Sequence, residues 1–485
     1  MAIGDIGSVI ATKEWRSGDI YLPFLSHATG TIYLIFEAVN RTVRSVSIDG
    51  AGNIGAEIDS LLLGAVGGPP RGAVHISGDV YAIAFLASTQ VVVKTFTCDS
   101  SGNLDDTGMD TINLAAKPAN NGFYAHIIPS HKPNIYIVAY TDSADDGWLA
   151  TITINDDGSI DEPVLHTWEI QPAQGRYPWL INISNNLFAV IISEATSNRS
   201  QITTFTVSDT GVMSSIQAYL FDGNTNSGNG GIILHVSGDV YAIFWQGAAL
   251  DGWIYTLSIN GAGAISANID TWEFVTTYGH NPQAYLASEN QAGNGQVFVV
   301  VHSQNGVDGP QVFTVEILNN GTISKSFIGE LTLVAADYAH DLSIVRPGRG
   351  IYAACFEDFT GGNSGKIKTF DVEEALALSS VTTDPAAVLG AIAATLNGTL
   401  DEDGGEVCEC GFEWGLDTSY GHFTSTESKA KGQTFSQIIG GLQPGTTYHF
   451  RAFATNSVGT SYGADRSFTT DIVISRAYAL AREEL

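Results

Sequence analysis

Positively charged residues are scarce in this 485-residue sequence. Lys and Arg together number 21 against 51 Asp and Glu, which gives a formal net charge of −30. Such a chain repels a phosphate backbone instead of releasing its counterions, so nucleic acid is excluded as an expected partner. Charged residues make up only 15% of the sequence, so Gly, Ser, Thr and Asn must form much of the surface.

Cysteine and long apolar runs are also in short supply. No stretch approaches the roughly 20 apolar residues that span a bilayer, and the first residues, MAIGDIGSVIATKEW, lack the basic and apolar segments of an export signal. Cys98 and Cys355 are isolated, while Cys408 and Cys410 alternate along one predicted strand, where they are poorly placed to bridge each other. No second C-x-C or CxxC motif completes a zinc site, so reduced structural cysteines are expected.

What the sequence contains instead is a repeated strand pattern. A core recurs as TIYLIF, DVYAIAF, NIYIVAY, LFAVII, DVYAIFW, QVFVVV and GIYAACF, with its aromatic residue 48 to 57 positions from the next one. Turns such as DGAGNI and NGAGAI follow each next strand. Their glycines supply the positive φ that tight hairpins need, at Gly52, Gly102, Gly158, Gly211, Gly263 and Gly321.

Each repeat is predicted to contain four short antiparallel strands. Four strands repeated at this spacing resemble a β-propeller blade, whose WD40 and kelch families have repeats of similar length, although neither signature is present. The resemblance covers residues 1–377 and implies an all-β fold, a seven-bladed β-propeller. It is a resemblance of architecture and implies no particular ligand.

The two ends of this region complete each other. The seventh repeat lacks an outer strand after KIKTFDV, and the segment GSVIATKEW near the N-terminus matches the outer-strand segments that contain Trp168 and Trp272. We therefore expect residues 7–15 to pair with residues 366–372. This pairing would complete the last blade and remove two exposed edges.

A different module follows over residues 378–471. The run GLQPGTTYHFRAFATNSVG resembles the E-to-F region of fibronectin type III domains, and FEWG and RSFTT fit the middle and last strands of that β-sandwich. Tyr448 occupies the position of the tyrosine corner. Residues 472–485 are predicted to form a short helical tail with Ser475 as N-cap. Tyr478, Ala481 and Leu485 would share its apolar face.

The long predicted connections would lie on one face of the propeller. They join the outer strand of one blade to the inner strand of the next, and the second strand to the third. Aromatic rings that stack on sugars and carboxylates that accept hydroxyl groups make this long-loop face the candidate ligand site. Alternatively, Asp-Gly pairs simply form turns, and Tyr and His cover strand ends. The candidate residues are Tyr124, His126, Asp142, Asp146, Trp148, Arg176, Tyr177, Asp251, Trp253, Tyr278, His280, Tyr338, His340 and Asp341.

Metal candidates are few. His27, His75 and His235 each lie six residues before the strand aromatic. Three imidazoles facing a central channel would suit a metal, but equivalent positions in a repeat also carry equivalent packing. The acidic loop from Asp142 to Asp146 offers oxygen ligands for Ca²⁺ but lacks the EF-hand spacing. No other cofactor is expected.

The sequence favours a non-enzymatic function. It has no nucleophile elbow, P-loop, HExxH motif or dinucleotide fingerprint. The combination of modules resembles phage virion and adhesin-type proteins, which implies a structural or binding protein that forms a homo-oligomer or is present in many copies on a virion or extracellular particle surface. Its partners would be host-surface glycans and other particle subunits, the latter bound through the C-terminal domain and tail; no membrane contact is expected. The alternatives are a propeller-type polysaccharide lyase or glycoside hydrolase, whose carboxylates would lie on distant blades, and a bacterial surface scaffold or adhesin.

Overall fold

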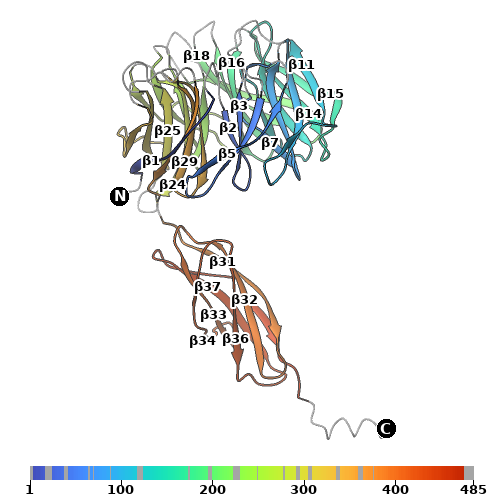
Figure 1. The fold of residues 1–485 in the computed structure, drawn as a ribbon, viewed down its shortest axis with the longest axis vertical. Coiled ribbons are helices and arrows are strands. Elements are labelled where there is room, and N and C mark those ends of the chain that lie inside the picture. The colour runs from blue at the N-terminus through green and yellow to red at the C-terminus, as the bar shows by residue number, and fades with distance from the viewer. Residues whose placement is uncertain are drawn as a thin grey trace. The chain divides into compact units, whose positions relative to one another are not determined.

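The computed structural model divides the chain into two compact units, Met1–Glu374 (unit 1) and Ala375–Leu485 (unit 2) (Figure 1). The described residues contain 39 strands and no helix, so none of them forms a helix suited to crossing a membrane. The described residues are 4–16, 24–37, 42–63, 66–68, 70–87, 89–116, 124–172, 175–194, 199–221, 230–247, 250–276, 279–290, 295–303, 309–334, 339–358, 364–374 and 376–473.

The described strands of unit 1 form seven antiparallel sheets, most of them four-stranded. We number the sheets in chain order. Sheet 1 contains β2 (Phe24–Thr29), β3 (Ile32–Glu37), β4 (Thr42–Ile48) and β5 (Ile54–Leu62). Sheet 2 contains β6 (Val66–Gly68), β7 (Val74–Ser77), β8 (Val80–Ala87), β9 (Gln90–Cys98), β10 (Leu104–Asp105) and β11 (Thr111–Ala116). Sheet 3 contains β12 (His126–Pro129), β13 (Ile135–Thr141), β14 (Gly147–Ile154) and β15 (Ile160–Gln171).

The remaining sheets of unit 1 follow the same order. Sheet 4 contains β16 (Gly175–Ser184), β17 (Leu187–Glu194), β18 (Arg199–Val207) and β19 (Met213–Leu220). Sheet 5 contains β20 (Gly231–Ser237), β21 (Val240–Gln246), β22 (Gly252–Ser258) and β23 (Asp270–Val275). Sheet 6 contains β24 (His280–Asn290), β25 (Gly295–Ser303), β26 (Pro310–Leu318) and β27 (Glu330–Thr332). Sheet 7 contains β28 (Ala339–Gly348), β29 (Ile351–Asp358), β30 (Ser364–Val372) and the N-terminal β1 (Ile6–Arg16).

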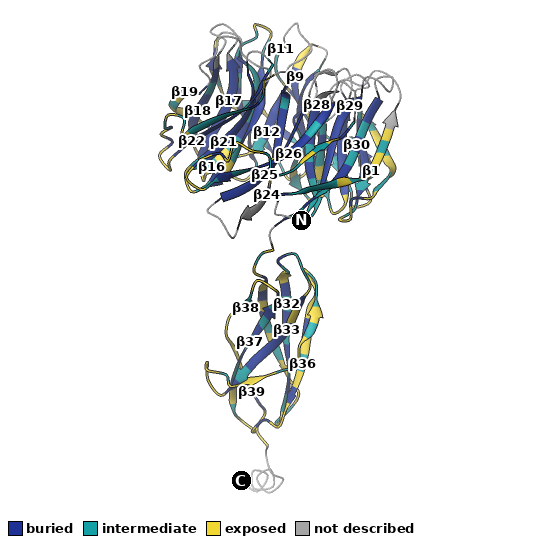
Figure 2. Cartoon of the chain, turned by 90° about the vertical axis from the view of Figure 1, so that its left-hand side faces the viewer, coloured by how far each residue is buried: buried dark blue, intermediate teal, exposed yellow. Residues whose placement is uncertain are grey.

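The second strand of each sheet lies in the core. In sheet 2, where β6 and β7 both pair with β8, the second and third strands are β8 and β9. All residues of β3, β13 and β25 are buried, whereas β15 and β19 alternate between exposed and intermediate positions. Figure 2 shows the same contrast, with dark-blue central strands and a mixed pattern along β1. A strand covered on both faces reads as a continuous apolar run, which explains why these strands gave the clearest repeat in the sequence.

The N-terminal strand completes the last sheet of unit 1. β1 pairs antiparallel with β30 from Ile6 opposite Val372 to Arg16 opposite Gly365. The backbone amide of Gly4 extends the pairing by donating to the Glu373 carbonyl over 2.8 Å. The predicted pairing of residues 7–15 with residues 366–372 is therefore confirmed.

A repeated hydrogen bond connects each sheet of unit 1 to the next. In every sheet a fully buried Ser or Thr hydroxyl on the third strand donates to the carbonyl of a glycine in the following sheet, and that glycine has a φ of 81° to 91°. The pairs are Ser45 to Gly102, Thr95 to Gly158, Thr151 to Gly211, Thr204 to Gly263, Thr256 to Gly321, Thr314 to Gly4 and Thr369 to Gly52. The last pair leads from sheet 7 back to sheet 1.

Unit 2 consists of two antiparallel sheets around one core. The first contains β31 (Ser380–Val388), β32 (Ala393–Glu402) and β36 (Thr434–Gly440). The second contains β33 (Cys408–Gly415), β34 (His422–Phe423), β35 (Glu427–Lys429), β37 (Thr447–Thr455), β38 (Thr460–Tyr462) and β39 (Arg466–Thr469). The Tyr448 hydroxyl accepts a hydrogen bond from the Gln443 amide over 3.0 Å, as expected of a tyrosine corner. The predicted helix with Ser475 as N-cap lies outside the described residues.

All four cysteines are buried and unbridged, as the sequence predicts. Burial raises the pKa of the Cys98 thiol to about 11 and that of Cys410 to about 12. The thiols of the folded protein are therefore protonated and unreactive at neutral pH.

Candidate functional site

The two kinds of long connection meet on one face of unit 1. The Thr141 hydroxyl, at the end of β13, donates to the Gly175 carbonyl at the start of β16 over 2.8 Å. Likewise, the Gln246 side-chain oxygen at the end of β21 accepts from the Asn281 amide in β24 over 3.2 Å. The ends of second strands therefore lie beside the starts of the next inner strands. This is the long-loop face.

An arginine between β6 and β7 brings several sheets together on this face. The Arg71 guanidinium lies 4.2 Å from the ring centre of Tyr124 and 5.4 Å from that of Trp179. It also donates to the Gly231 carbonyl over 3.3 Å. Arg71 thus contacts sheets 3, 4 and 5 from the segment that leads into sheet 2. We did not identify Arg71 or Trp179 from the sequence, although Arg71 lies in the same kind of inter-sheet connection as Tyr124.

His126 has a structural role in this aromatic cluster. Its ring stacks on Trp179 at 4.4 Å between ring centres, and its Nδ1 accepts from the Leu180 amide over 2.9 Å. Burial, together with the charge of Arg71, lowers the pKa of His126 to about 3. The imidazole is therefore neutral at physiological pH and acts as an acceptor. Beside it, Tyr124 packs against Tyr177, with ring centres 5.7 Å apart.

The loop between β13 and β14 is held by its own side chains. Asp142 accepts a hydrogen bond from the Trp148 indole N–H over 3.0 Å, and Asp145 forms an ion pair with Arg176 at 2.5 Å. Burial and the charge of Asp142 raise the pKa of the Asp146 carboxyl. Two of the carboxylates proposed as Ca²⁺ ligands, those of Asp142 and Asp145, thus already have protein partners. The described residues contain no group of three or more His, Cys, Asp or Glu arranged for a metal.

The loop between β21 and β22 carries a second acidic pair. Asp251 is only 7% exposed, and Glu273 lies beside it on β23. Burial, the Asp251 charge and a hydrogen bond with Asp251 raise the pKa of the Glu273 carboxyl. Trp253 is half-buried and lies opposite Glu273 in the pairing of β22 with β23. A tryptophan beside two carboxyl groups therefore occurs in sheet 5, as it does around Trp148 in sheet 3.

Part of the predicted face lies outside the described residues. Tyr278 and Tyr338 fall there completely, while for His340 and Asp341 the structure describes the backbone of β28 only. His280 is 7% exposed at the start of β24. The described part of the candidate site therefore spans sheets 3 to 6.

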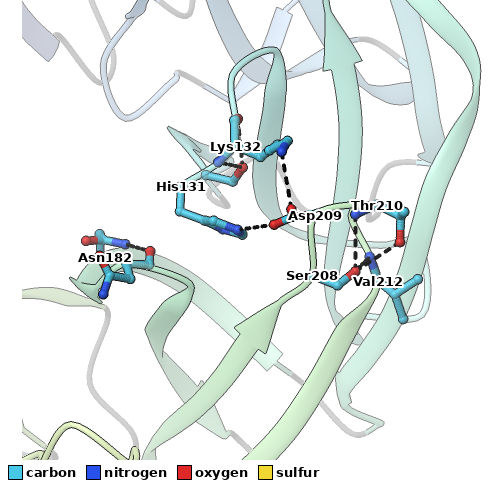
Figure 3. A network of polar contacts seen from close by, with 9 residues as sticks. His131, Lys132, Asn182, Ser208, Asp209, Thr210 and Val212 are labelled. Carbon is cyan, nitrogen blue, oxygen red and sulfur yellow. Dashed lines mark hydrogen bonds and ion pairs between the residues drawn. The ribbon is translucent and has the colours of Figure 1, made fainter.

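The histidines considered as metal ligands stabilise their own hairpins. In each case the imidazole Nε2 donates to a glycine carbonyl three residues later, over 3.1 Å for His27 and 2.8 Å for both His75 and His235. Each ring also packs on its strand tyrosine at 5.1 to 5.2 Å between centres. At the equivalent position in sheet 4, Asn182 donates to the Asn185 carbonyl over 3.1 Å (Figure 3). The structure favours the packing alternative over the metal hypothesis.

A polar contact on the opposite face, formed by the short turns, joins sheets 3 and 4. Asp209 accepts from His131 Nε2 over 3.0 Å and from Lys132 Nζ over 3.2 Å (Figure 3). The hydrogen bond from His131, with that from Lys132, lowers the pKa of Asp209. This contact fixes neighbouring turns, and the short loops around it leave the long-loop face as the candidate site.

No family model and no curated protein sequence matches this chain. Among solved structures, the chain is similar to a candidate 6-phosphogluconolactonase from Bacteroides uniformis at 10% identity, covering 82% of this chain and 95% of that one with a TM-score of 0.47. A streptogramin B lyase is similar at 13% identity over 74% of this chain and 98% of that one, with a TM-score of 0.41. The sensor domain of the anti-sigma factor RsgI4 from Pseudobacteroides cellulosolvens matches 20% of this chain and all 100% of that one, at 21% identity and a TM-score of 0.17. The chain's own four-stranded antiparallel sheets give it an all-β, β-propeller-like architecture.

Proposed function

We propose that this chain is a non-enzymatic glycan-binding protein of a phage or virus-like particle, built from a seven-bladed β-propeller and a fibronectin type III-like domain. The observation that carries the proposal is the repeated pairing of a half-buried tryptophan with two carboxyl groups on the long-loop face. It occurs at Trp148, whose indole N–H donates to Asp142 with Asp146 close to that carboxylate, and at Trp253 with Asp251 and Glu273. Flat rings that stack on sugars and carboxylates that accept hydroxyl groups are the groups that carbohydrate sites use.

Two features support the architecture within this proposal. The chain of buried hydroxyl bonds passes through seven sheets and returns to the first, which suits a closed ring of blades. In unit 2 the Tyr448 hydroxyl holds the segment before its strand, as in fibronectin type III domains.

Unit 2 is proposed to attach the protein to other particle subunits. Large apolar side chains are unusually exposed there: Leu416 by 64%, Phe423 by 68% and Ile438 by 71%. Exposed apolar surface of this kind marks sites of protein contact. Mass spectrometry of purified phage particles tests the setting, and absence of this chain from them would contradict it.

Glycoside hydrolysis is the second candidate function, and one observation favours it. The raised pKa of Glu273 beside Asp251 is the property that a general acid needs. Binding and hydrolysis differ in their products, so one assay distinguishes the two functions.

The assay uses immobilised surface polysaccharides from a panel of bacteria. We expect the protein to be retained without release of shorter chains, and a Trp148→Ala/Trp253→Ala double variant to be retained about 10-fold less, because each ring supplies stacking area. Tyr462→Ala, at a half-exposed aromatic of unit 2, is the matched control. Equal retention of the tryptophan variant would overturn the site, and release of fragments that stops in Glu273→Gln would favour the hydrolase.

A further inference from the structure

Three segments form the end of unit 2 at which its described residues stop. They are the turn between β31 and β32, the loop before β37 and the segment after β39. The Asp471 amide donates to the Gly390 carbonyl over 3.2 Å, and the Leu442 amide donates to the Ile392 carbonyl over 3.1 Å. The Gly445 amide donates to the Asp471 carbonyl over 3.0 Å. The three segments therefore form one surface, which we call the C-terminal end of unit 2.

Large aliphatic side chains are exposed on this surface. They come from the turn, from the segment after β39 and from β36, whose Gly440 pairs with Ala393 at the start of β32. Each is between 38% and 76% exposed: Val388, Leu389, Ile392, Ile438, Ile472 and Val473. Single exposed aliphatic residues are ordinary, whereas a group of them on one surface marks a site of contact with another molecule.

The apolar area of this surface matches the requirement of a small dimer interface. A fully exposed Val, Leu or Ile side chain presents about 100 Å² of apolar surface. At their observed exposures the six side chains together present on the order of 400 Å². Homodimer interfaces are about 65% apolar, so this area suits an interface of about 600 Å² per copy. Two copies would bury about 1,200 Å² in total, which is the lower limit of specific interfaces.

The charge distribution favours a second copy of this chain as the partner. Each copy carries a formal net charge of −30, so two copies repel each other over most of their surfaces. Residues 388–393, 438–445 and 470–473 contain a single charged residue, Asp471. Two copies that meet through this nearly uncharged surface therefore bury apolar area with little electrostatic cost.

We propose that the C-terminal end of unit 2 binds the same end of a second copy around a two-fold axis. Such an axis brings one surface of both copies together, so Ile438 and Ile472 each contribute twice to the contact. This inference rests on the attachment role proposed for unit 2 and names another copy of the chain as the partner. It does not depend on glycan binding by unit 1.

Sedimentation velocity of the full chain between about 1 and 500 µM tests the proposal, and we expect a dimer with a Kd on the order of 10 µM, because the interface is small. Ile438→Ser/Ile472→Ser removes apolar area at exposed positions and should weaken association about 100-fold, since each substitution acts on both copies. The matched control is Val407→Ser/Val458→Ser. These two valines are also exposed but lie near Thr455, at the other end of β37, so the control should associate as the wild type does.

Two further readouts locate the contact. Added NaCl screens the repulsion between acidic copies and should strengthen the association of the wild type and of the control. In hydrogen–deuterium exchange, peptides that contain residues 388–393 and 470–473 should exchange more slowly at about 500 µM than at about 5 µM, because the dimer covers them. Peptides around Val407 should exchange at the same rate at both concentrations.

The outcomes separate this inference from the proposed function. A full chain that stays monomeric at about 500 µM overturns the second-copy contact. If that chain is nevertheless found in purified phage particles, unit 2 attaches to a different subunit and the proposed function stands. Equal association of the two double variants also overturns the inference, because the contact then lies elsewhere. If the chain dimerises through this end but phage particles lack it, the contact stands and the proposed setting fails.

Discussion

The seven buried Ser and Thr hydrogen bonds between the sheets of unit 1 predict how much stability is lost when any one of them is removed, and this loss tests whether unit 1 is closed. Replacing Thr204 by valine keeps the side-chain shape but leaves the buried Gly263 carbonyl without its donor. Such a loss costs about 1–3 kcal/mol. Because the bonds made by Thr314 and Thr369 are equally buried, Thr314→Val and Thr369→Val should cost the same amount. In an open array these two residues would be terminal and their loss would cost little.

Urea denaturation followed by tryptophan fluorescence measures these costs as shifts in midpoint at constant m. The corresponding Thr→Ser variants are matched controls, because serine keeps the hydroxyl, as the natural Ser45 does in sheet 1. If Thr314→Val and Thr369→Val shift the midpoint by less than a third of the Thr204→Val shift, the two ends of unit 1 do not close the array. That result would refute the reasoning.

Three further predictions concern other parts of the chain. Deleting residues 1–16 removes β1 and exposes the edge of β30, so light scattering should detect association and Tm should fall; an unchanged monomer would contradict the pairing. Burial lowers the pKa of His126 to about 3 and that of His302 to about 4, so the unfolded state binds more protons below pH 6.5. The free energy of unfolding should therefore fall as pH drops from 6.5 towards 4, by up to about 1.4 kcal/mol per pH unit for each of the two imidazoles. His302→Gln should show a flatter pH profile, and a profile equal to that of the wild type would contradict this reasoning. Tyr448→Phe removes the acceptor of a backbone amide and should lower the stability of unit 2 by about 1–2 kcal/mol, with no change in the calorimetric transition of unit 1.

The sequence predicted the features that depend on local patterns. Second strands covered on both faces, such as β13, are continuously apolar, and turn glycines such as Gly158 need a positive φ. Both signals lie within a few residues, so the repeat could be recognised without coordinates. The pairing of β1 with β30 was predictable because the N-terminal segment resembles the outer strands of other repeats, while the seventh repeat lacks an outer strand of its own.

The contacts of the candidate site were harder to predict from the sequence because they join residues that are far apart in the chain. Arg71 contacts Tyr124 and Trp179 only after three sheets are assembled. The buried Ser or Thr of each third strand bonds to a glycine 57 to 65 residues away in five sheets, and more than 300 residues away in the other two.

The buried cysteines have a practical consequence for studying this molecule. Cys98 and Cys355 lie in the core of unit 1, and Cys408 and Cys410 lie in the core of unit 2. Because a thiol reacts only when its surroundings open, residue-resolved alkylation rates report the opening of each unit separately. The unmodified protein therefore carries two native thiol probes in each unit, and their alkylation can time local unfolding without the introduction of further cysteines.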